Sequence, residues 1–427
     1  MRNDKLKNIW RNNVINSFAI TGFLILFFIF SKNFLTFLYQ IVMGRLLSPS
    51  EFGLLSALLS ILAILTIPYK SITIVAAKKS SLIALNKTLG AIKSLFINIL
   101  RFIFPFFIGI GLLLLIFSPF IATTLKFETE ILIFITVSYV FSTVINPVIE
   151  GIFQGMENTN RLGFSLLLFP GIRLVIGLLL VLYGFGVVGA IWGIIIAGFC
   201  TPILLLVFVS PYFYTNREDF PVNIDFQVIF PVLITDIGFI LFFNLDILLI
   251  RIFFSTTESG YYAILSTIGR IVLYSATAFI IVMIPKAVKA HESRQDVLKV
   301  LKTSLLISLC LSMVVYLSIF FMGEFFVLTI FGELYRPAIA YLPFFTLVFL
   351  LYGVVAILIN YNVALNNYSY NIPLFLGIIF EVIGIILFHD SLSTIFLIMF
   401  FSVCFMIFGI ISMILVKRDQ SNNRTVQ

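Results

Sequence analysis

Charged side chains inside long apolar stretches are the residues of this sequence best placed to do chemistry. Lys32, Arg173 and Arg270 each lie within such a stretch. An ionisable residue at the centre of a bilayer costs about 2.5–3.5 kcal/mol on insertion scales, so proteins keep such residues where they pair or line a wet cavity. A cavity with a basic bias suits an anionic substrate, for example one with a phosphate or pyrophosphate group. We therefore predict that these three cations bind a substrate anion.

Polar residues at helical spacing accompany the cations. Lys32 is followed by Thr36 and Tyr39, and a second stripe repeats at steps of three or four residues through Thr136, Tyr139, Thr143, Asn146 and Glu150. Steps of this size place side chains on one face of a helix. We expect Tyr39, Tyr139, Asn146 and Glu150 to line the same substrate site. The alternative is that these groups bond within their own helix or join two helices.

Acidic residues gather in the second half of the chain. Asp236, Asp246 and Glu381 all lie within apolar stretches. A buried carboxylate can exchange a proton because burial penalises its charged form. With a hydroxyl such as that of Thr394 nearby, it could instead hold Na⁺, a hard cation that prefers oxygen ligands. We expect these four residues to couple H⁺ or Na⁺, with no other cofactor or metal. The alternatives are an ion pair of Asp246 with Arg270 or Arg251, a hydrogen bond to Asp236 from a neighbouring span, and a position of Glu381 near a lipid headgroup.

The elements that must position these residues are transmembrane helices. Hydrophobic residues make up 61% of the 427 residues and charged residues only 11%, whereas soluble domains carry about 25% charged residues. Apolar stretches of bilayer-spanning length recur along the chain, and they do not alternate as membrane strands do. We predict an all-α integral membrane protein with about twelve spans, near residues 16–42, 52–77, 89–117, 130–153, 162–183, 187–209, 226–250, 259–284, 298–321, 338–362, 371–388 and 393–416.

The distribution of basic residues predicts the orientation in the membrane. With twelve spans, the two termini and the even-numbered loops hold 18 Lys and Arg, whereas the opposite loops hold only Arg45, Lys126, Arg251 and Arg336. Cytoplasmic loops carry the excess of positive charge. We therefore expect a multi-pass protein of the cell membrane with both termini in the cytoplasm. The net charge of +8 follows from this bias and does not indicate nucleic-acid binding.

A short motif repeats near the middle of the chain. The pattern S-x-x-E-x-G begins at Ser48 and again at Ser255, which lies 207 residues later, and each copy opens an apolar stretch. Ser and Glu three residues apart predict a helix capping box. The repeat predicts two six-helix bundles that enter the membrane in the same sense, as in parallel-repeat transporters. We place the first bundle at 1–213, the second at 214–416, and a polar, disordered cytoplasmic tail at 417–427.

Enzyme activity has little support in the sequence. The two histidines, His291 and His389, lie in predicted loops, and neither a metal-ligand cluster nor a phosphate-binding glycine loop of known spacing is present. The predicted external loops are too short to house a catalytic site. The sequence therefore favours a transporter over an enzyme.

Two phrases of the sequence resemble a known family. Residues 41–53, IVMGRLLSPSEFG, resemble the start of polysaccharide biosynthesis flippases, and residues 150–155, EGIFQG, resemble the phrase that closes their fourth span. These flippases, of the O-antigen type, belong to the multidrug/oligosaccharidyl-lipid/polysaccharide exporter superfamily. Span number, length and two-bundle layout extend the resemblance over nearly the whole chain.

The resemblance implies two lobes around a central cavity and a transport function. The implied substrate is an oligosaccharide linked to a polyprenyl (pyro)phosphate, which alternating access moves from the inner to the outer leaflet. The implied partners are membrane lipids and the glycosyltransferases and polymerase of the same pathway. The resemblance also implies basic residues in the cavity, for which Lys32, Arg173 and Arg270 are the candidates. The alternatives are a cation-coupled drug antiporter of the same superfamily and a non-transporting scaffold for polysaccharide assembly.

Overall fold

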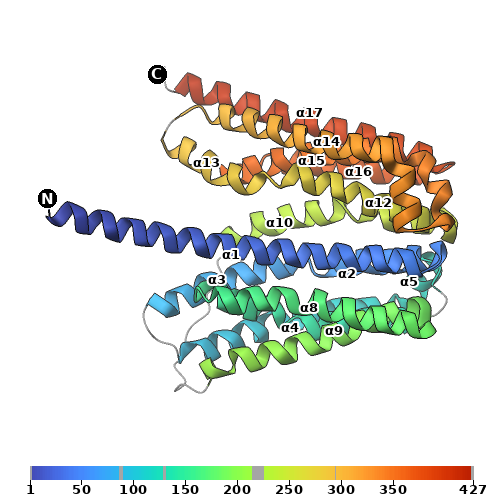
Figure 1. Cartoon of the computed structure of the whole chain (residues 1–427), viewed down its shortest axis with the longest axis horizontal. Coiled ribbons are helices and arrows are strands. Elements are labelled where there is room, and N and C mark those ends of the chain that lie inside the picture. Colours follow the sequence, from blue (N-terminus) through green and yellow to red (C-terminus); the bar gives the residue numbers. More distant parts are fainter. Residues whose placement is uncertain (1, 86–89, 128–130, 214–225, 294, 425–427) are drawn as a thin grey trace. The chain divides into compact units, whose positions relative to one another are not determined.

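The computed structural model describes residues 2–85, 90–127, 131–213, 226–293 and 295–424, with the side chains at 1–20, 226–229, 232 and 417–424 left undescribed. Every regular element in this part of the chain is a helix, and Figure 1 shows the helices in chain order. The prediction of an all-α fold is therefore confirmed.

Helices α1 to α9 occupy the first half of the chain. They are α1 (Arg2–Leu46), α2 (Pro49–Leu65), α3 (Pro68–Leu85), α4 (Ala91–Ile116), α5 (Ser118–Thr124), α6 (Ile131–Thr143), α7 (Asn146–Gly155), α8 (Thr159–Leu180), the π-helical turn η1 (Val181–Phe185) and α9 (Gly186–Val209).

The second half begins after the short 3-10 helix η2 (Ser210–Phe213). It contains α10 (Phe226–Phe242), α11 (Leu245–Phe253), α12 (Thr256–Thr277), α13 (Ile280–Glu292), α14 (Val297–Ile330), the 3-10 helix η3 (Glu333–Tyr341), α15 (Leu342–Ala364), α16 (Asn371–Leu387) and α17 (Leu392–Arg424).

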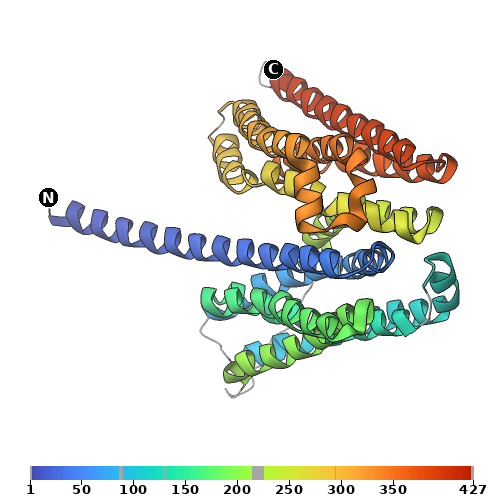
Figure 2. The ribbon, with the colours of Figure 1, turned by 45° about the vertical axis from the view of Figure 1, so that its right-hand side comes forward.

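Among the described residues, nine helical stretches are long and apolar enough to cross a membrane, and the bent pair α2 and α3 makes a tenth. One of the nine, Thr159–Phe213, has 55 residues and would be about 80 Å long as a straight helix, far more than one bilayer requires. It contains α8 and α9, which lie side by side in Figures 1 and 2 and therefore form two crossings. The 17-residue helix α16 is the remaining apolar segment. With this division, each of the twelve predicted spans corresponds to a helix or a broken helix.

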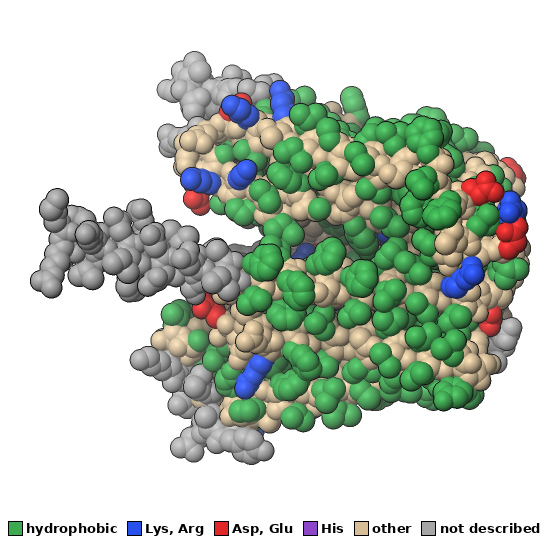
Figure 3. Space-filling model, in the orientation of Figure 1, with side chains coloured by type: hydrophobic (Ala, Val, Ile, Leu, Met, Phe, Trp, Pro, Cys, Tyr) green, Lys and Arg blue, Asp and Glu red, His purple; other side chains and the backbone are tan. Residues whose placement is uncertain are grey.

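The surface fits a lipid environment. Large hydrophobic side chains, among them Phe23, Phe30, Phe321 and Phe408, are exposed by two thirds or more. Figure 3 shows such side chains along the helices of both units, whereas most acidic and basic side chains visible in that view lie near helix ends. An exposed apolar surface of this extent is expected when lipid tails replace water as the solvent.

The helices form two compact units. Unit 1 consists of Met1–Met43, Pro68–Thr123 and Phe127–Ile229, and unit 2 consists of Gly44–Ile67, Thr124–Lys126 and Phe230–Gln427. Two short segments of the first half of the sequence, including all of α2, therefore group with the second half. The predicted boundary between residues 213 and 214 separates the two copies of the sequence repeat. The structure in addition groups α2, from the first copy, with the helices of the second copy.

Local structure supports the internal repeat. Both predicted capping boxes form, and Ser48 and Ser255 share the same backbone angles, φ −65° and ψ 158°. Two further pairs of residues have positive φ at nearly the same offset: Lys126 with Gly332, and Glu157 with Asn366. Repetition of these uncommon conformations 206 and 209 residues apart indicates that the two halves fold alike.

Helix α17 corrects the prediction for the C-terminal tail. We expected residues 417–427 to be disordered, but α17 continues to Arg424. The extension contains Lys417, Arg418 and Gln420, which are good helix formers, and propagating an existing helix is easier than nucleating a new one.

Candidate functional site

Arg173 on α8 is the centre of the polar interior of unit 1. Its side chain is 6% exposed. The guanidinium carbon lies 4.3 Å from the ring centroid of Tyr39 and 5.4 Å from that of Phe169. The Nε atom is buried without a hydrogen-bond partner, and no carboxylate pairs with the side chain in the part of the chain that the structure describes. Aromatic faces rather than an acid therefore compensate this cation, which leaves its hydrogen-bond donors for another anion.

Close packing of α8 and α9 fixes the aromatic partner of Arg173. A Cβ atom on Gly193 would lie 2.6 Å from the Cα atom of Gly177, so the two backbones can approach this closely only at glycine. The hydroxyl of Tyr39 donates to the carbonyl of Ala190 on α9 at 3.1 Å, and the Tyr39 side chain is fully buried. The ring of Tyr39 is thus held rigidly against the guanidinium.

The polar stripe on the fourth predicted span surrounds the same region. The ring of Tyr139 on α6 lies 5.6 Å from that of Phe169. Thr143 and the hydroxyl of Tyr69 are 2.7 Å apart. The helix breaks after Thr143, and Asn146 begins α7 with its Oδ1 atom buried and without a hydrogen-bond partner among the residues that the structure describes. The stripe therefore supplies an aromatic wall, one satisfied hydroxyl pair and one unsatisfied carbonyl oxygen.

Lys32 and Glu150 complete the polar residues of unit 1. Lys32 is exposed on α1, seven residues before Tyr39 and on the same helical face. Glu150 is half-buried on α7 and interacts electrostatically with Lys32. Lys32 thus interacts with a carboxylate, whereas Arg173 interacts with the two tyrosines, Tyr39 and Tyr139. We refer to the predicted site residues of this unit as the basic cluster: Lys32, Tyr39, Tyr139, Asn146, Glu150 and Arg173.

Unit 2 has a polar interior of the opposite sign, centred on Asp246. This residue of α11 is 1% exposed, and its Oδ2 atom accepts a hydrogen bond of 2.5 Å from the hydroxyl of Tyr262 on α12. Its Oδ1 atom is buried and has no hydrogen-bond partner among the described residues. Glu381 on α16, which is 5% exposed, interacts electrostatically with Asp246. Two buried carboxyl groups, one on α11 and one on α16, therefore interact with each other.

Hydroxyl groups surround the second carboxyl group. Tyr352 on α15 and Ser402 on α17 both interact with Glu381, but Ser402 directs its hydrogen bond to the carbonyl of Gly377 at 2.9 Å. The Oε2 atom of Glu381 remains buried without a hydrogen-bond partner in the described part of the chain. We refer to Asp246, Tyr262, Tyr352, Glu381 and Ser402 as the acidic cluster. Its unsatisfied oxygen atoms can accept a proton or contact a small cation.

Arg270, which is predicted to bind substrate, interacts with a member of the acidic cluster in the structure. Its Nη2 atom donates to the carbonyl of Phe243 at 3.1 Å, a carbonyl left without a helical partner by the break between α10 and α11. Arg270 also interacts electrostatically with Asp246. Arg251, the other arginine near this acid in sequence, binds Ser259 and two backbone carbonyls.

The structure gives the other two predicted ion-coupling residues, Asp236 and Thr394, interactions with Tyr370 and Ser391. Asp236 on α10 is buried and interacts electrostatically with Tyr370, which shares a 2.6 Å contact between hydroxyl groups with Thr235. Thr394 lies in the first turn of α17, where its amide donates to the Oγ atom of Ser391. Along α17, Thr394 is about 12 Å from the level of Ser402. Its hydrogen bond with Ser391 therefore stabilises the start of α17.

Sequence reasoning missed several contributors to the two clusters. Phe169 lies four residues before Arg173, a spacing that brings two side chains of a helix together, so this pair could have been found. Tyr262, Tyr352 and Ser402 approach the acids from three different helices. Their roles depend on tertiary packing, which periodicity along one helix does not reveal.

Comparison with known families gives one match in sequence. A family model described as "Polysaccharide biosynthesis protein" matches residues 42–340. A search of curated proteins found no match.

Comparison with solved structures shows the fold. An inward-facing multidrug resistance MATE family transporter of the MOP superfamily aligns with a TM-score of 0.71 and 12% identity, covering 90% of this chain and 94% of that one. The lipid II flippase MurJ in an inward closed conformation aligns with a TM-score of 0.64 and 14% identity, covering 94% and 87%. An outward-facing MATE transporter aligns with a TM-score of 0.57 and 15% identity, covering 92% and 94%. The chain thus shares the fold of these transporters and flippases.

Proposed function

Since the chain belongs to the polysaccharide biosynthesis protein family and has the fold of MOP-superfamily transporters, we propose that it flips a polyprenyl-(pyro)phosphate-linked oligosaccharide. The headgroup moves from the inner to the outer leaflet of the cell membrane by alternating access. Both termini lie in the cytoplasm. The glycosyltransferases that assemble the oligosaccharide supply the substrate, and a polymerase uses the product.

The observation that carries the proposal is the buried guanidinium of Arg173. A buried charge is costly unless it is paired, yet in the described part of the chain the rings of Tyr39 and Phe169 alone lie over the guanidinium. Arginine presents several donors in a planar fork that matches phosphate oxygens. A (pyro)phosphate linkage would supply the missing anion, so Arg173 is the proposed anchor of the substrate.

The other members of the basic cluster have proposed supporting roles. Lys32 is a second, mobile cation for the linkage, and Glu150 holds its ammonium group when no substrate is present. Tyr139 and Asn146 offer an aromatic face and an amide, groups that suit the apolar faces and hydroxyl groups of a sugar. This arrangement favours an anionic, sugar-bearing lipid over a free phosphate.

The acidic cluster has the proposed role of coupling transport to an ion. Asp246 and Glu381 place two buried carboxyl groups together, each with one unsatisfied oxygen. Two such groups resist simultaneous ionisation, so either a proton or Na⁺ relieves the repulsion. Arg270 interacts with Asp246 and can respond to the change in charge.

Cation-coupled export of drugs is a second candidate function, favoured by the same acidic cluster. Buried carboxylates can bind an organic cation as well as an inorganic one. In that case the basic cluster would be structural and Arg173 would be dispensable for ligand binding. The two functions therefore predict opposite substrate charges.

Equilibrium binding to the purified protein tests the proposal. A polyprenyl-pyrophosphate oligosaccharide should bind the parent protein, and Arg173→Gln should weaken it about 10-fold to 100-fold, the effect of losing hydrogen bonds to a charged group. The matched control is Arg161→Gln, because Arg161 also lies on α8 and 5.4 Å from an aromatic ring, that of Tyr212. Equal affinities in both variants, or binding of a cationic dye instead, would contradict the proposal.

A further inference from the structure

Two arginines recur with the internal repeat at the end of unit 2 that is predicted to be external. Arg45 precedes the capping-box residue Ser48 by three residues, and Arg251 precedes its counterpart Ser255 by four. The two arginines are thus nearly as far apart in sequence as the two capping boxes. Both arginines are among the four basic residues of the predicted external loops.

Each arginine binds a backbone carbonyl in or just after the last turn of a helix from the other half of the sequence. Arg251 donates through Nε to the carbonyl of Leu125 at 3.0 Å and through Nη2 to that of Lys126 at 3.1 Å. Arg45 donates through Nη1 to the carbonyl of Leu328 at 3.4 Å, four residues before Gly332. Lys126 and Gly332 both have positive φ, 53° and 101°. All six residues belong to unit 2.

A close crossing of α2 and α12 lies beside these contacts. A Cβ atom on Gly53 would lie 2.8 Å from the amide nitrogen of Gly260, and a Cβ atom on Gly260 would overlap the carbonyl of Pro49. Ser259, which flanks the crossing, accepts a hydrogen bond of 3.1 Å from Nη1 of Arg251. The glycines of the repeated motif therefore have a physical role, because they let the two capped helix ends meet.

Further polar contacts surround the same place. The Nζ atom of Lys126 donates to the carbonyl of Phe254 at 2.5 Å, at the end of α11. The hydroxyl of Tyr335 donates to the carbonyl of Leu47 at 3.3 Å. In all these contacts, side-chain donors hold backbone carbonyls at chain turns and helix ends. Such carbonyls are left without helical partners, and water can replace the donors when the segments part.

We propose that the reciprocal pair Arg45 and Arg251, together with the Gly53–Gly260 crossing, forms a clasp that opens during the transport cycle. The clasp holds α2 and the segment Thr124–Lys126 on the helices of the second half in the state described here. Its release lets α2 separate from α12. The inference rests on the proposed transport function, since alternating access requires each end of the protein to close and open in turn.

The two arginines of the clasp differ in their exposure and in the number of hydrogen bonds that they make. Arg251 is 1% exposed and makes three hydrogen bonds, whereas Arg45 is exposed and makes one long bond. Arg251 is therefore the fixed side of the clasp and Arg45 the side that releases first. Because Arg45 is exposed, its replacement should leave the fold intact.

A cysteine reporter on α2 tests the clasp. In a variant with Cys200, Cys310 and Cys404 replaced by alanine, Ala57→Cys places a thiol one turn after Gly53 on the same face, at a position that is fully buried. The labelling rate with a polar maleimide is measured on purified protein in lipid nanodiscs, where both faces meet the reagent. Arg45→Gln should raise the rate about 10-fold, the equivalent of one hydrogen bond to a charged group.

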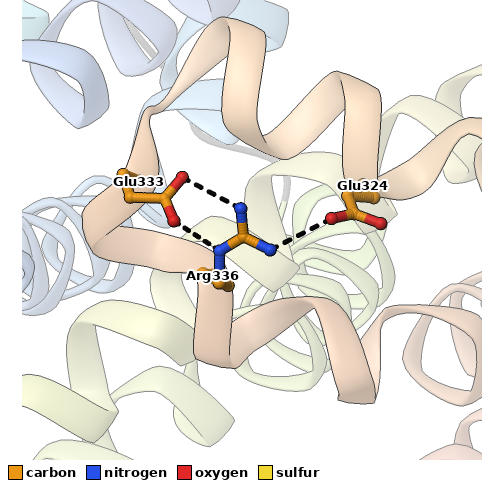
Figure 4. A network of polar contacts seen from close by, with 3 residues as sticks. All are labelled: Glu324, Glu333 and Arg336. Atoms are coloured by element: carbon orange, nitrogen blue, oxygen red, sulfur yellow. Dashed lines mark hydrogen bonds and ion pairs between the residues drawn. The ribbon is translucent and has the colours of Figure 1, made fainter.

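Arg336→Gln is the matched control. Arg336 also lies at the predicted external end, but it binds the carboxylates of Glu333 and Glu324 on the surface and not a backbone carbonyl (Figure 4). Its replacement should leave the labelling rate at the parent value. A rate for Arg45→Gln equal to that of the control would overturn the clasp. Arg251→Gln should label faster still, with its melting temperature measured to detect unfolding.

This readout is independent of the substrate. If labelling responds as expected while the parent protein fails to bind a lipid-linked oligosaccharide, the clasp stands and the proposed substrate is wrong. If the oligosaccharide binds while labelling of Arg45→Gln stays at the parent rate, the clasp is wrong and the proposed substrate stands.

Discussion

The two units bury charged groups of opposite sign and stabilise them by different contacts. In unit 1 the guanidinium of Arg173 lies against the faces of Tyr39 and Phe169. In unit 2 the carboxyl group of Asp246 accepts a hydrogen bond from the hydroxyl of Tyr262. Tyrosine thus serves a cation with its ring and an anion with its hydroxyl. A repeated architecture can therefore carry opposite charges in its two halves and divide substrate binding from ion coupling.

Removing the buried cation of unit 1 should have the largest effect on transport. With Arg173→Gln we expect export of surface polysaccharide in cells to fall at least about 100-fold, because a ligand phosphate loses several charge-assisted hydrogen bonds. Protein level in the membrane should stay the same. Normal export by this variant would show that the basic cluster is structural and would remove the contrast between the units.

Neutralising an acid of unit 2 should change coupling and leave substrate binding intact. Asp246→Asn and Glu381→Gln remove one ionisable group each from the acidic cluster. In proteoliposomes we expect both variants to lose the response of transport to an imposed proton or sodium gradient, because neither can change charge at the altered position. Their affinity for the substrate should match the parent. A parent-like gradient response in both variants would exclude these residues from coupling.

Changes at Tyr39 separate its ring from its hydroxyl. Tyr39→Leu removes the face that covers Arg173, so transport should fall about 10-fold to 30-fold, as expected for loss of a desolvated cation–π contact. Tyr39→Phe keeps the face and loses only the bond to the carbonyl of Ala190, at a cost of about 1 kcal/mol of stability. If the two variants transport equally poorly, the hydroxyl and not the ring is what unit 1 needs.

The smallest effect should come from a hydroxyl outside the acidic cluster, that of Thr394 in the first turn of α17. We therefore expect Thr394→Val to keep its gradient response within about 2-fold of the parent, since its hydrogen bonds go to Ser391 at the start of α17. Loss of that response in Thr394→Val would enlarge the coupling site beyond the five residues named.

The sequence predicted the fold well because its signals are local. Apolar stretches of bilayer length marked the helices, and the capping motifs at Ser48 and Ser255 marked two helix starts and the repeat. Prolines coincide with two of the breaks, because α3 begins at Pro68 and α7 begins at Asn146, directly before Pro147.

The candidate sites were predictable only in part. Single charges within apolar stretches identified Arg173, Asp246 and Glu381, because their burial cost makes them conspicuous. Their partners were not predictable, since Tyr262 and Tyr352 reach the acids by the packing of separate helices. For the same reason the interaction of Arg270 with Asp246 was not predictable from the sequence.

Movement of the proposed substrate by the purified parent protein is the most direct test of the central claim. Proteoliposomes would carry a fluorescent polyprenyl-pyrophosphate oligosaccharide in both leaflets, and a membrane-impermeant quencher would report the fraction exposed outside. The account predicts that the parent protein shifts the lipid between leaflets under a proton or sodium gradient and that Arg173→Gln does not. Exposure equal to that of protein-free liposomes, with a cationic dye transported instead, would contradict it.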